Sequence, residues 1–379
     1  MARGRGLGPS LSVALLLCGS QLAAEDEASW KQAEAKVLAR LAKQGLGIER
    51  AELAPPPKRN GAEALGRALE VLETIPQETR YTWNAVTQIY GGDLSETYHG
   101  AELGREEQIE LVEQGLRAAK RALPEVETAL NAEAILYPVD WARGLPGSLG
   151  SPPAWQAGVK EIAWLLLARA TVARAAGQHA QAWADLERAF TLPQRLRQPG
   201  IVARYTRTAL VKIALEGLNH ALGAGPAPPP DVRDRLLAAL KELQRPPDLP
   251  RLVRTELALL LGGLDHRKPL EGIEYTVGFS LAEAPVGSMA EPEQREWVAR
   301  ERALCVQRFA AVLDVLTESE SKQPLRERLL ALPLIDPTRP PHWGLLASTQ
   351  DPARTARLTL DSEQKLVAEL RKAAEALGR

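Results

Sequence analysis

Apolar residues recur along most of this chain at intervals of three and four positions, the spacing of one face of an α-helix. No convincing run of alternating apolar and polar residues, the pattern of a half-buried strand, competes with that spacing. The helical stripes are Trp30, Ala33, Val37 and Leu41, ending near Gly45; Ile109, Val112, Leu116, Ala119 and Leu123, stopped by Pro124; Leu166, Ala170 and Ala173; Ala182, Leu186, Ala189 and Phe190; Val202, Tyr205, Leu210 and Ile213; and Leu366, Leu370, Ala373 and Leu377.

Composition supports the same fold class. Hydrophobic residues make up 45% of the chain, but aromatic residues only 4%. A β-sandwich needs many β-branched and aromatic residues in short runs, whereas the abundant Ala, Leu, Glu and Arg of this chain favour helices. We therefore predict an all-α fold.

Proline and glycine cluster at several points, and the cluster GAGPAPPP at residues 223–230 is the best domain boundary. A polyproline run holds an extended spacer because it cannot continue a helix. We predict an N-terminal helical-repeat lobe at residues 25–222 and a C-terminal helical lobe at residues 231–379; whether they form one solenoid stays open. Other such clusters lie at residues 54–57, 137–153 and 336–341.

The first residues resemble a secretory signal peptide. Arg3 and Arg5 precede the short apolar run Leu11–Gly19, and small residues follow up to Ala24. The apolar run is too short to span a bilayer, and no stop-transfer pattern follows it. We predict that residues 1–24 are removed and that the protein is exported, periplasmic or extracellular, with no transmembrane segment after cleavage.

The two cysteines carry little chemistry. Leu16 and Leu17 occupy the positions where a lipoprotein signal has small residues, so we do not expect a lipid anchor at Cys18. Once Cys18 is removed, Cys305 is the only thiol and no intramolecular disulfide can form. Cys305 has helical apolar neighbours, so we predict a buried core residue rather than a reactive thiol.

The charge of the chain is nearly balanced. The formal net charge is −1, and loss of Arg3 and Arg5 with the signal peptide makes it −3. Nucleic acid and anionic lipid both need a concentrated basic face, so neither is an expected partner.

One stretch, Ala175–Pro193, resembles the second half of a tetratricopeptide repeat, with a glycine turn, small residues at the helix contact and bulky residues one turn later. Residues 60–225 also resemble a group of secreted helical proteins from high-GC bacteria such as planctomycetes. The resemblance implies a degenerate tetratricopeptide-like array or solenoid, and no particular activity. It is carried by Trp83, Asn84 and Ala85, the segment Tyr137–Trp141, and Gly177, Ala182, Asp185 and Leu186.

Sequence motifs for catalysis and metal binding are missing. No pair of histidines has the close spacing of a helical metal site, and no glycine-rich phosphate loop is followed by lysine. We predict no catalytic residue, no metal and no cofactor. Asp93, Glu96 and Asp140 lie in or beside loops where acid and base chemistry on a glycoside is conceivable, but most loop carboxylates are simply solvated.

Aromatic residues gather between residues 81 and 205 and point to a binding surface. The long loop that begins at Tyr137 is rich in Pro and Gly yet carries aromatic side chains, and loops of this length are often functional. The alternative is that the rings pack the N-terminal lobe and the loop caps a helix pair. The candidate residues for binding a ligand or partner are Tyr137, Asp140, Trp141, Arg143 and Trp155.

Taken together, these features predict an exported helical-repeat scaffold that binds a protein or peptide partner in the cell envelope without catalysis. One alternative is a helical-toroid enzyme or binding protein that acts on envelope carbohydrate. Another is a structural envelope protein with no discrete ligand. Two carboxylates facing each other across a closed pocket would favour the enzyme, and an open groove with scattered charge would favour the scaffold.

Overall fold

The computed structural model describes residues 26–77, 79–80, 105–141, 154–223, 226–266, 271, 273, 289–318, 321, 323–332 and 351–378. Throughout these residues the regular structure is helical, without a named β-strand. Two isolated β-bridges join Asn60 to Ala134 and Ile135 to Leu196. The predicted all-α fold class is confirmed.

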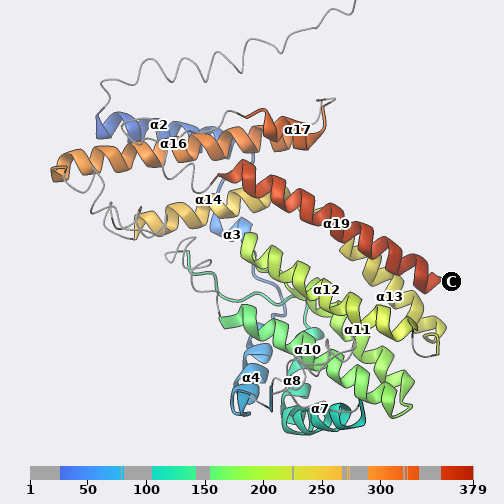
Figure 1. Ribbon diagram of the computed structural model, residues 1–379. Coiled ribbons are helices and arrows are strands. Elements are labelled where there is room, and N and C mark those ends of the chain that lie inside the picture. Colours follow the sequence, from blue (N-terminus) through green and yellow to red (C-terminus); the bar gives the residue numbers. More distant parts are fainter. Residues whose placement is uncertain are drawn as a thin grey trace, which may run out of the picture.

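The helices form a long stack (Figure 1). At one end α2 (Glu27–Lys43) lies beside α16 (Glu291–Thr317), and α7 (Arg105–Ala119) lies at the other end. Between them α12 (Ile201–Gly223) contacts α19 (Pro352–Gly378). The remaining helices are α3 (Arg50–Leu53), α4 (Ala62–Glu73), the 3-10 turn η1 (Lys120–Ala122), α8 (Leu123–Leu130), α10 (Ala154–Ala175), α11 (His179–Arg195), α13 (Pro230–Leu243), α14 (Leu249–Asp265) and α17 (Leu325–Leu330).

Most of the predicted amphipathic stripes are confirmed as buried faces. Trp30 and Leu41 of the first stripe are buried on α2, and Gly45 follows that helix with a left-handed φ of 71°. Gly177, with φ of 74°, forms the turn between α10 and α11, where glycine avoids the steric cost of a side chain. All four residues of the last stripe are buried on α19.

Two predictions at this level were wrong. Pro124 does not end the second stripe, because α7 already ends at Ala119. Pro124 lies instead in the first turn of α8, where a backbone N–H would form no hydrogen bond within the helix, so proline is tolerated there. Tyr205 does not share the buried face of α12, because it is 39% exposed and Thr206 takes the buried position instead.

The larger hydrophobic cluster, called core 1 here, joins α4, α7, α8, α10, α11, α12 and α13 to the second half of α19. Gly217 of α12 faces side chains of α10 and α11, and a Cβ at this glycine would lie 3.0 Å from Leu167 Cγ and 2.8 Å from a methyl of Leu186. The absence of a side chain therefore lets three helices approach closely.

The second cluster, called core 2, brings the N-terminal helix α2 together with C-terminal helices. Leu41 of α2 packs with residues of α14, α16 and α17 and with Ala353 and Ala356, at the start of α19. Packing also crosses the predicted linker at residues 223–230, because α11 contacts α13 and both belong to core 1. The division into two lobes stays a prediction.

Candidate functional site

The segment that follows α8, residues 131–141, runs from core 1 to core 2 and is called the strap here. Ile135 pairs with the end of α11: its N–H donates to the carbonyl of Arg195 at 2.7 Å, and its own carbonyl accepts from Arg197 N at 3.1 Å. The backbone N–H of Tyr137 donates to Gln198 Oε1 at 2.8 Å. The strap consequently starts fixed against the last turn of α11.

Tyr137 and Trp155 stack on each other at the edge of core 1. Their ring centroids are 5.7 Å apart and the ring planes differ by 18°. The Tyr137 hydroxyl is buried with no hydrogen-bond partner in the described part of the chain, and this burial raises the pKa of the phenol. Both rings pack against core 1.

Trp141 lies at the other end of the strap, against core 2. Its carbonyl oxygen rests on Gly262 of α14 so closely that a Cβ at this glycine would overlap it. The guanidinium of Arg50 lies over the indole ring, 5.8 Å from its centroid, in a cation–π arrangement. Trp141 thereby joins the strap to α3 and α14.

The five predicted binding residues are therefore divided between two places. Tyr137 and Trp155 form a pair at core 1, whereas Trp141 packs at core 2. Asp140 is exposed between them and engages in an interaction of its own. Arg143 lies outside the described residues. Their role in binding a partner stays a prediction.

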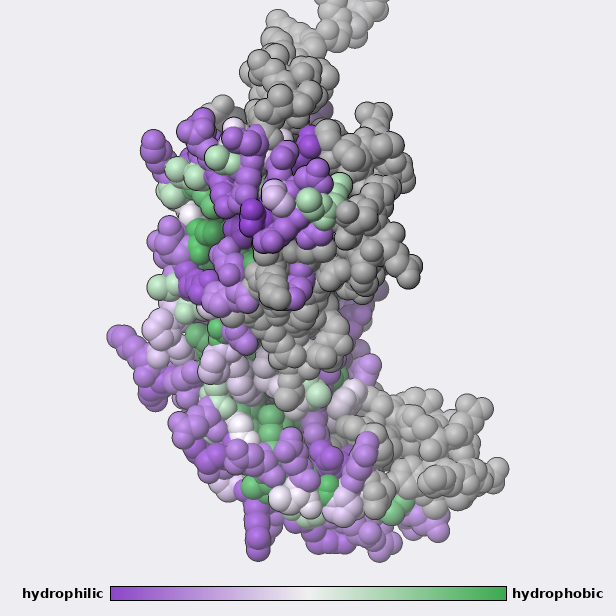
Figure 2. All heavy atoms as spheres, turned by 90° about the vertical axis from the view of Figure 1, so that its left-hand side faces the viewer, coloured by the Kyte–Doolittle hydropathy of each residue, from purple (hydrophilic) through white to green (hydrophobic). Residues whose placement is uncertain are grey.

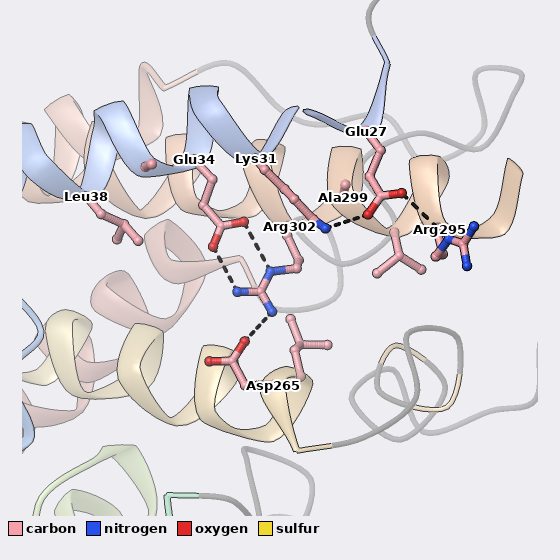
Figure 3. Close-up of a pocket in the computed structure, with 11 residues that line it drawn as sticks. Glu27, Lys31, Glu34, Leu38, Asp265, Arg295, Ala299 and Arg302 are labelled. Carbon is pink, nitrogen blue, oxygen red and sulfur yellow. Dashed lines mark hydrogen bonds and ion pairs between the residues drawn. The ribbon is translucent and has the colours of Figure 1, made fainter. Parts of the chain in front are cut away.

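A groove lies between α2, α16 and the last turn of α14 (Figure 3). Leu264, which lines the groove, follows two residues after Gly262, the glycine that Trp141 contacts. Its volume is about 460 Å³. In Figure 2, which faces the side of the molecule where these helix ends lie, hydrophilic residues surround smaller apolar patches. The groove is lined by the apolar residues Ala35, Leu38, Leu264, Val298 and Ala299 and by the charged residues Glu27, Lys31, Glu34, Asp265, Arg295 and Arg302.

Arg302 is the centre of the groove. Its guanidinium binds Glu34 of α2 through two nitrogens, at 2.8 and 3.1 Å, and Asp265 of α14 through the third, at 2.6 Å (Figure 3). A bidentate pair of this kind is the strongest form of the arginine–carboxylate contact. The three helices that form the groove are thus held together by one side chain.

The other charged residues lie near the start of α2. Glu27 pairs with Lys31 on its own helix and, at 3.7 Å, with Arg295 of α16. Arg295 also pairs with Glu291 at 3.0 Å. Since each of these groups is partly exposed, the pairs are weak and can be exchanged for contacts with a ligand.

The charged side chains of the groove are paired with one another. All three lining carboxylates, Glu27, Glu34 and Asp265, are engaged by cations rather than facing each other across the space. Within the described residues, no group of three or more His, Cys, Asp or Glu side chains is placed to hold a metal ion. Cys305, on α16, is fully buried as predicted, and burial raises the pKa of its thiol.

Sequence reasoning missed this groove for a physical reason. The stripe of Trp30, Val37 and Leu41 locates the buried face of α2, but the groove is lined by the edge of that face, where the charged residues Glu27, Lys31 and Glu34 lie. Charged residues there look like any solvated helix face. Only the pairing of α2 with α16, separated from it by about two hundred and fifty residues in the sequence, brings the lining together.

Comparison of the chain with protein-family models, with curated proteins and with solved structures found no match. Across the residues that the structure describes, no helix is both long and apolar enough to cross a membrane.

Proposed function

We propose that this protein is an exported, non-catalytic binding module and that the groove between α2, α14 and α16 receives a segment of a partner protein. The single observation that carries the proposal is a groove lined both by apolar side chains and by partly exposed, exchangeable ion pairs. A lining of this kind, in which apolar and charged side chains are mixed, is compatible with protein–protein recognition.

The lining defines what the segment should be. Ala35, Leu38 and Val298 offer apolar surface, so the segment should insert an apolar side chain. The border carries three acidic and three basic side chains, and its net charge is therefore zero. The segment should accordingly have charged residues of both signs around its apolar anchor, rather than a run of one sign.

Two further predictions belong to the same proposal. The helix pair α10 and α11, with its glycine turn and buried Ala182, Leu186 and Phe190, supports a tetratricopeptide-like array in which the remaining helices are degenerate copies. The signal-like segment 1–24 supports export, which would place the partner in the cell envelope.

Two matched variants of α2 test the proposal. Ala35 and Ala39 are both exposed and lie one turn apart, but only Ala35 lines the groove. Ala35→Trp should fill the groove, whereas Ala39→Trp adds the same ring outside it. The wild type and both variants are used to capture partners from an envelope extract of the source organism, with identification by mass spectrometry.

The expected result is one protein partner that is captured by the wild type and by Ala39→Trp but lost with Ala35→Trp. A partner retained by Ala35→Trp would contradict binding in the groove. Capture of cell-wall glycan alone would favour the carbohydrate alternative instead.

A further inference from the structure

Glu256 of α14 carries a buried carboxyl group. The residue is 7% exposed, and among the described residues its side chain forms no ion pair. Its Oε1 accepts one hydrogen bond, at 2.7 Å, from the backbone N–H of Ile201, the first residue of α12. A buried charge with so little compensation is costly, so its position needs an explanation.

The carboxylate lies at the junction of the two cores. Ile201 and Val202 of α12 pack with Leu249 and Leu252 of α14 in a small separate cluster, called the junction cluster here. Gly200, with φ of 92°, precedes α12, and a Cβ there would lie only 3.1 Å from Glu256 Oε1. The glycine thus makes room for the carboxylate at the point where α12 begins.

Three arginines on the elements around α14 pair with carboxylates other than Glu256, and a fourth, Arg207 of α12, is influenced by Glu363 and Glu242 rather than by Glu256. Arg204 of α12 pairs with Glu363 of α19, Arg254 of α14 with Glu52 of α3, and Arg308 of α16 with Asp351.

The charge of Glu256 also affects Tyr205 of α12. Burial, and to a lesser extent this carboxylate, raise the pKa of the Tyr205 phenol. It is neutral in the range where a carboxyl group titrates.

We propose that Glu256 is a pH-responsive latch, which holds the start of α12 against α14 when its carboxyl group is protonated and loosens the junction of the two cores when it is ionised. The latch is independent of the groove and of its ligand. An exported protein would be exposed directly to changes of the external pH, to which the latch would respond.

The sign of the effect follows from linkage. Burial raises the pKa of Glu256 from 4.5 to about 7, and the hydrogen bond from Ile201 only partly opposes the rise. When the junction opens, water reaches the carboxyl group and its pKa returns to the ordinary value. The closed junction therefore binds more protons than the open one, so closure is favoured at acid pH and weakens as pH rises toward about 7.

Hydrogen exchange of the first two turns of α12 tests the latch. Protection of these amides, corrected for the intrinsic dependence of exchange on pH, should fall about tenfold or more between about pH 5 and pH 8 in the wild type. Glu256→Gln keeps an oxygen that accepts from Ile201 but cannot ionise, so it should abolish the dependence.

The matched control is Glu216→Gln. Glu216 is also on α12 and burial also raises its pKa, but it lies about four turns from the junction. This variant should keep the wild-type pH dependence. Constant protection in the wild type, or a pH dependence that persists in Glu256→Gln, would overturn the proposal. The wild-type profile alone decides the matter if Glu256→Gln does not fold.

Discussion

Single glycines determine how closely some elements of this protein approach each other. Gly262 has no side chain where the strap crosses α14, and Gly217 has none where α10, α11 and α12 meet. By contrast Gly66 of α4 faces open space. The three glycines are alike in the sequence, and only packing distinguishes their roles.

At Gly262 we predict that substitution by alanine is destabilising. A Cβ would overlap the Trp141 carbonyl. Because this group belongs to the backbone and cannot rotate away as a flexible side chain can, the strap itself would have to shift. We expect the free energy of unfolding to fall by about 1–3 kcal/mol.

Gly66→Ala is the matched control, because both positions are inside helices. It should raise the free energy of unfolding by about 0.5–1 kcal/mol, since alanine loses less backbone entropy than glycine. Urea denaturation of both variants measures the difference, and equal effects would contradict the described contact.

Asp185 shows how a residue that attracts notice in the sequence can be structural. It is fully buried on α11 and accepts hydrogen bonds from Gln181 at 3.0 Å and Arg188 at 2.9 Å, with Arg169 of α10 at 3.5 Å. Burial raises the pKa of this carboxyl group, while Arg169 and the other partners oppose the rise. The residue thus fastens α10 to α11 inside core 1.

At the scale of elements, the mutual position of α2, α14 and α16 depends on Arg302. Glu34 is buried, and its carboxylate has a bidentate partner only as long as this arginine is present. Helices α2 and α16 run in the same direction, since Glu34 of α2 meets Arg302 of α16 and, further along both helices, Arg40 meets Asp314.

We predict that Arg302→Gln weakens the docking of α2. Removing one partner of a buried pair leaves an uncompensated charge, so the free energy of unfolding should fall by about 3 kcal/mol. Arg295→Gln, on the same face of the groove but with exposed partners, should cost less than about 1 kcal/mol. Hydrogen exchange of α2 amides distinguishes the two variants; equal protection would show that Arg302 does not hold the helix.

The helices themselves could be predicted, because a buried face imposes its 3.6-residue period on the sequence directly. The error at Tyr205 arose because α12 is buried on several sides and its apolar positions do not form one stripe. The groove and the latch could not be predicted: Glu34, Glu256 and Arg302 are ordinary charged residues of helices until distant elements are packed together.

At the scale of the whole molecule, α19 joins the two cores. Its first turns contribute Ala353 and Ala356 to core 2, and its second half contributes Leu366 and Leu370 to core 1. A helix shared in this way couples the stability of the cores. The molecule should therefore unfold as one cooperative unit.

Leu370→Ala tests that coupling, because Leu370 is 0% exposed whereas Leu358 on the same helix is 51% exposed. The buried substitution should cost about 2–5 kcal/mol, and Leu358→Ala less than about 0.5 kcal/mol. Fluorescence of Trp183 in core 1 and of Trp297 in core 2, measured in proteins that retain one of them at a time, should report the same transition. Loss of stability at Trp183 alone would contradict the coupling.

Site-specific photocrosslinking tests whether the groove between α2, α14 and α16 receives a partner protein. A photoreactive phenylalanine analogue is introduced at position 35 or at position 39 of the exported protein, and the source cells are irradiated. We expect a crosslink from position 35 to one segment with an apolar residue between charges of both signs, and none from position 39. Crosslinking of the same partner from both positions, or from neither, would contradict this expectation.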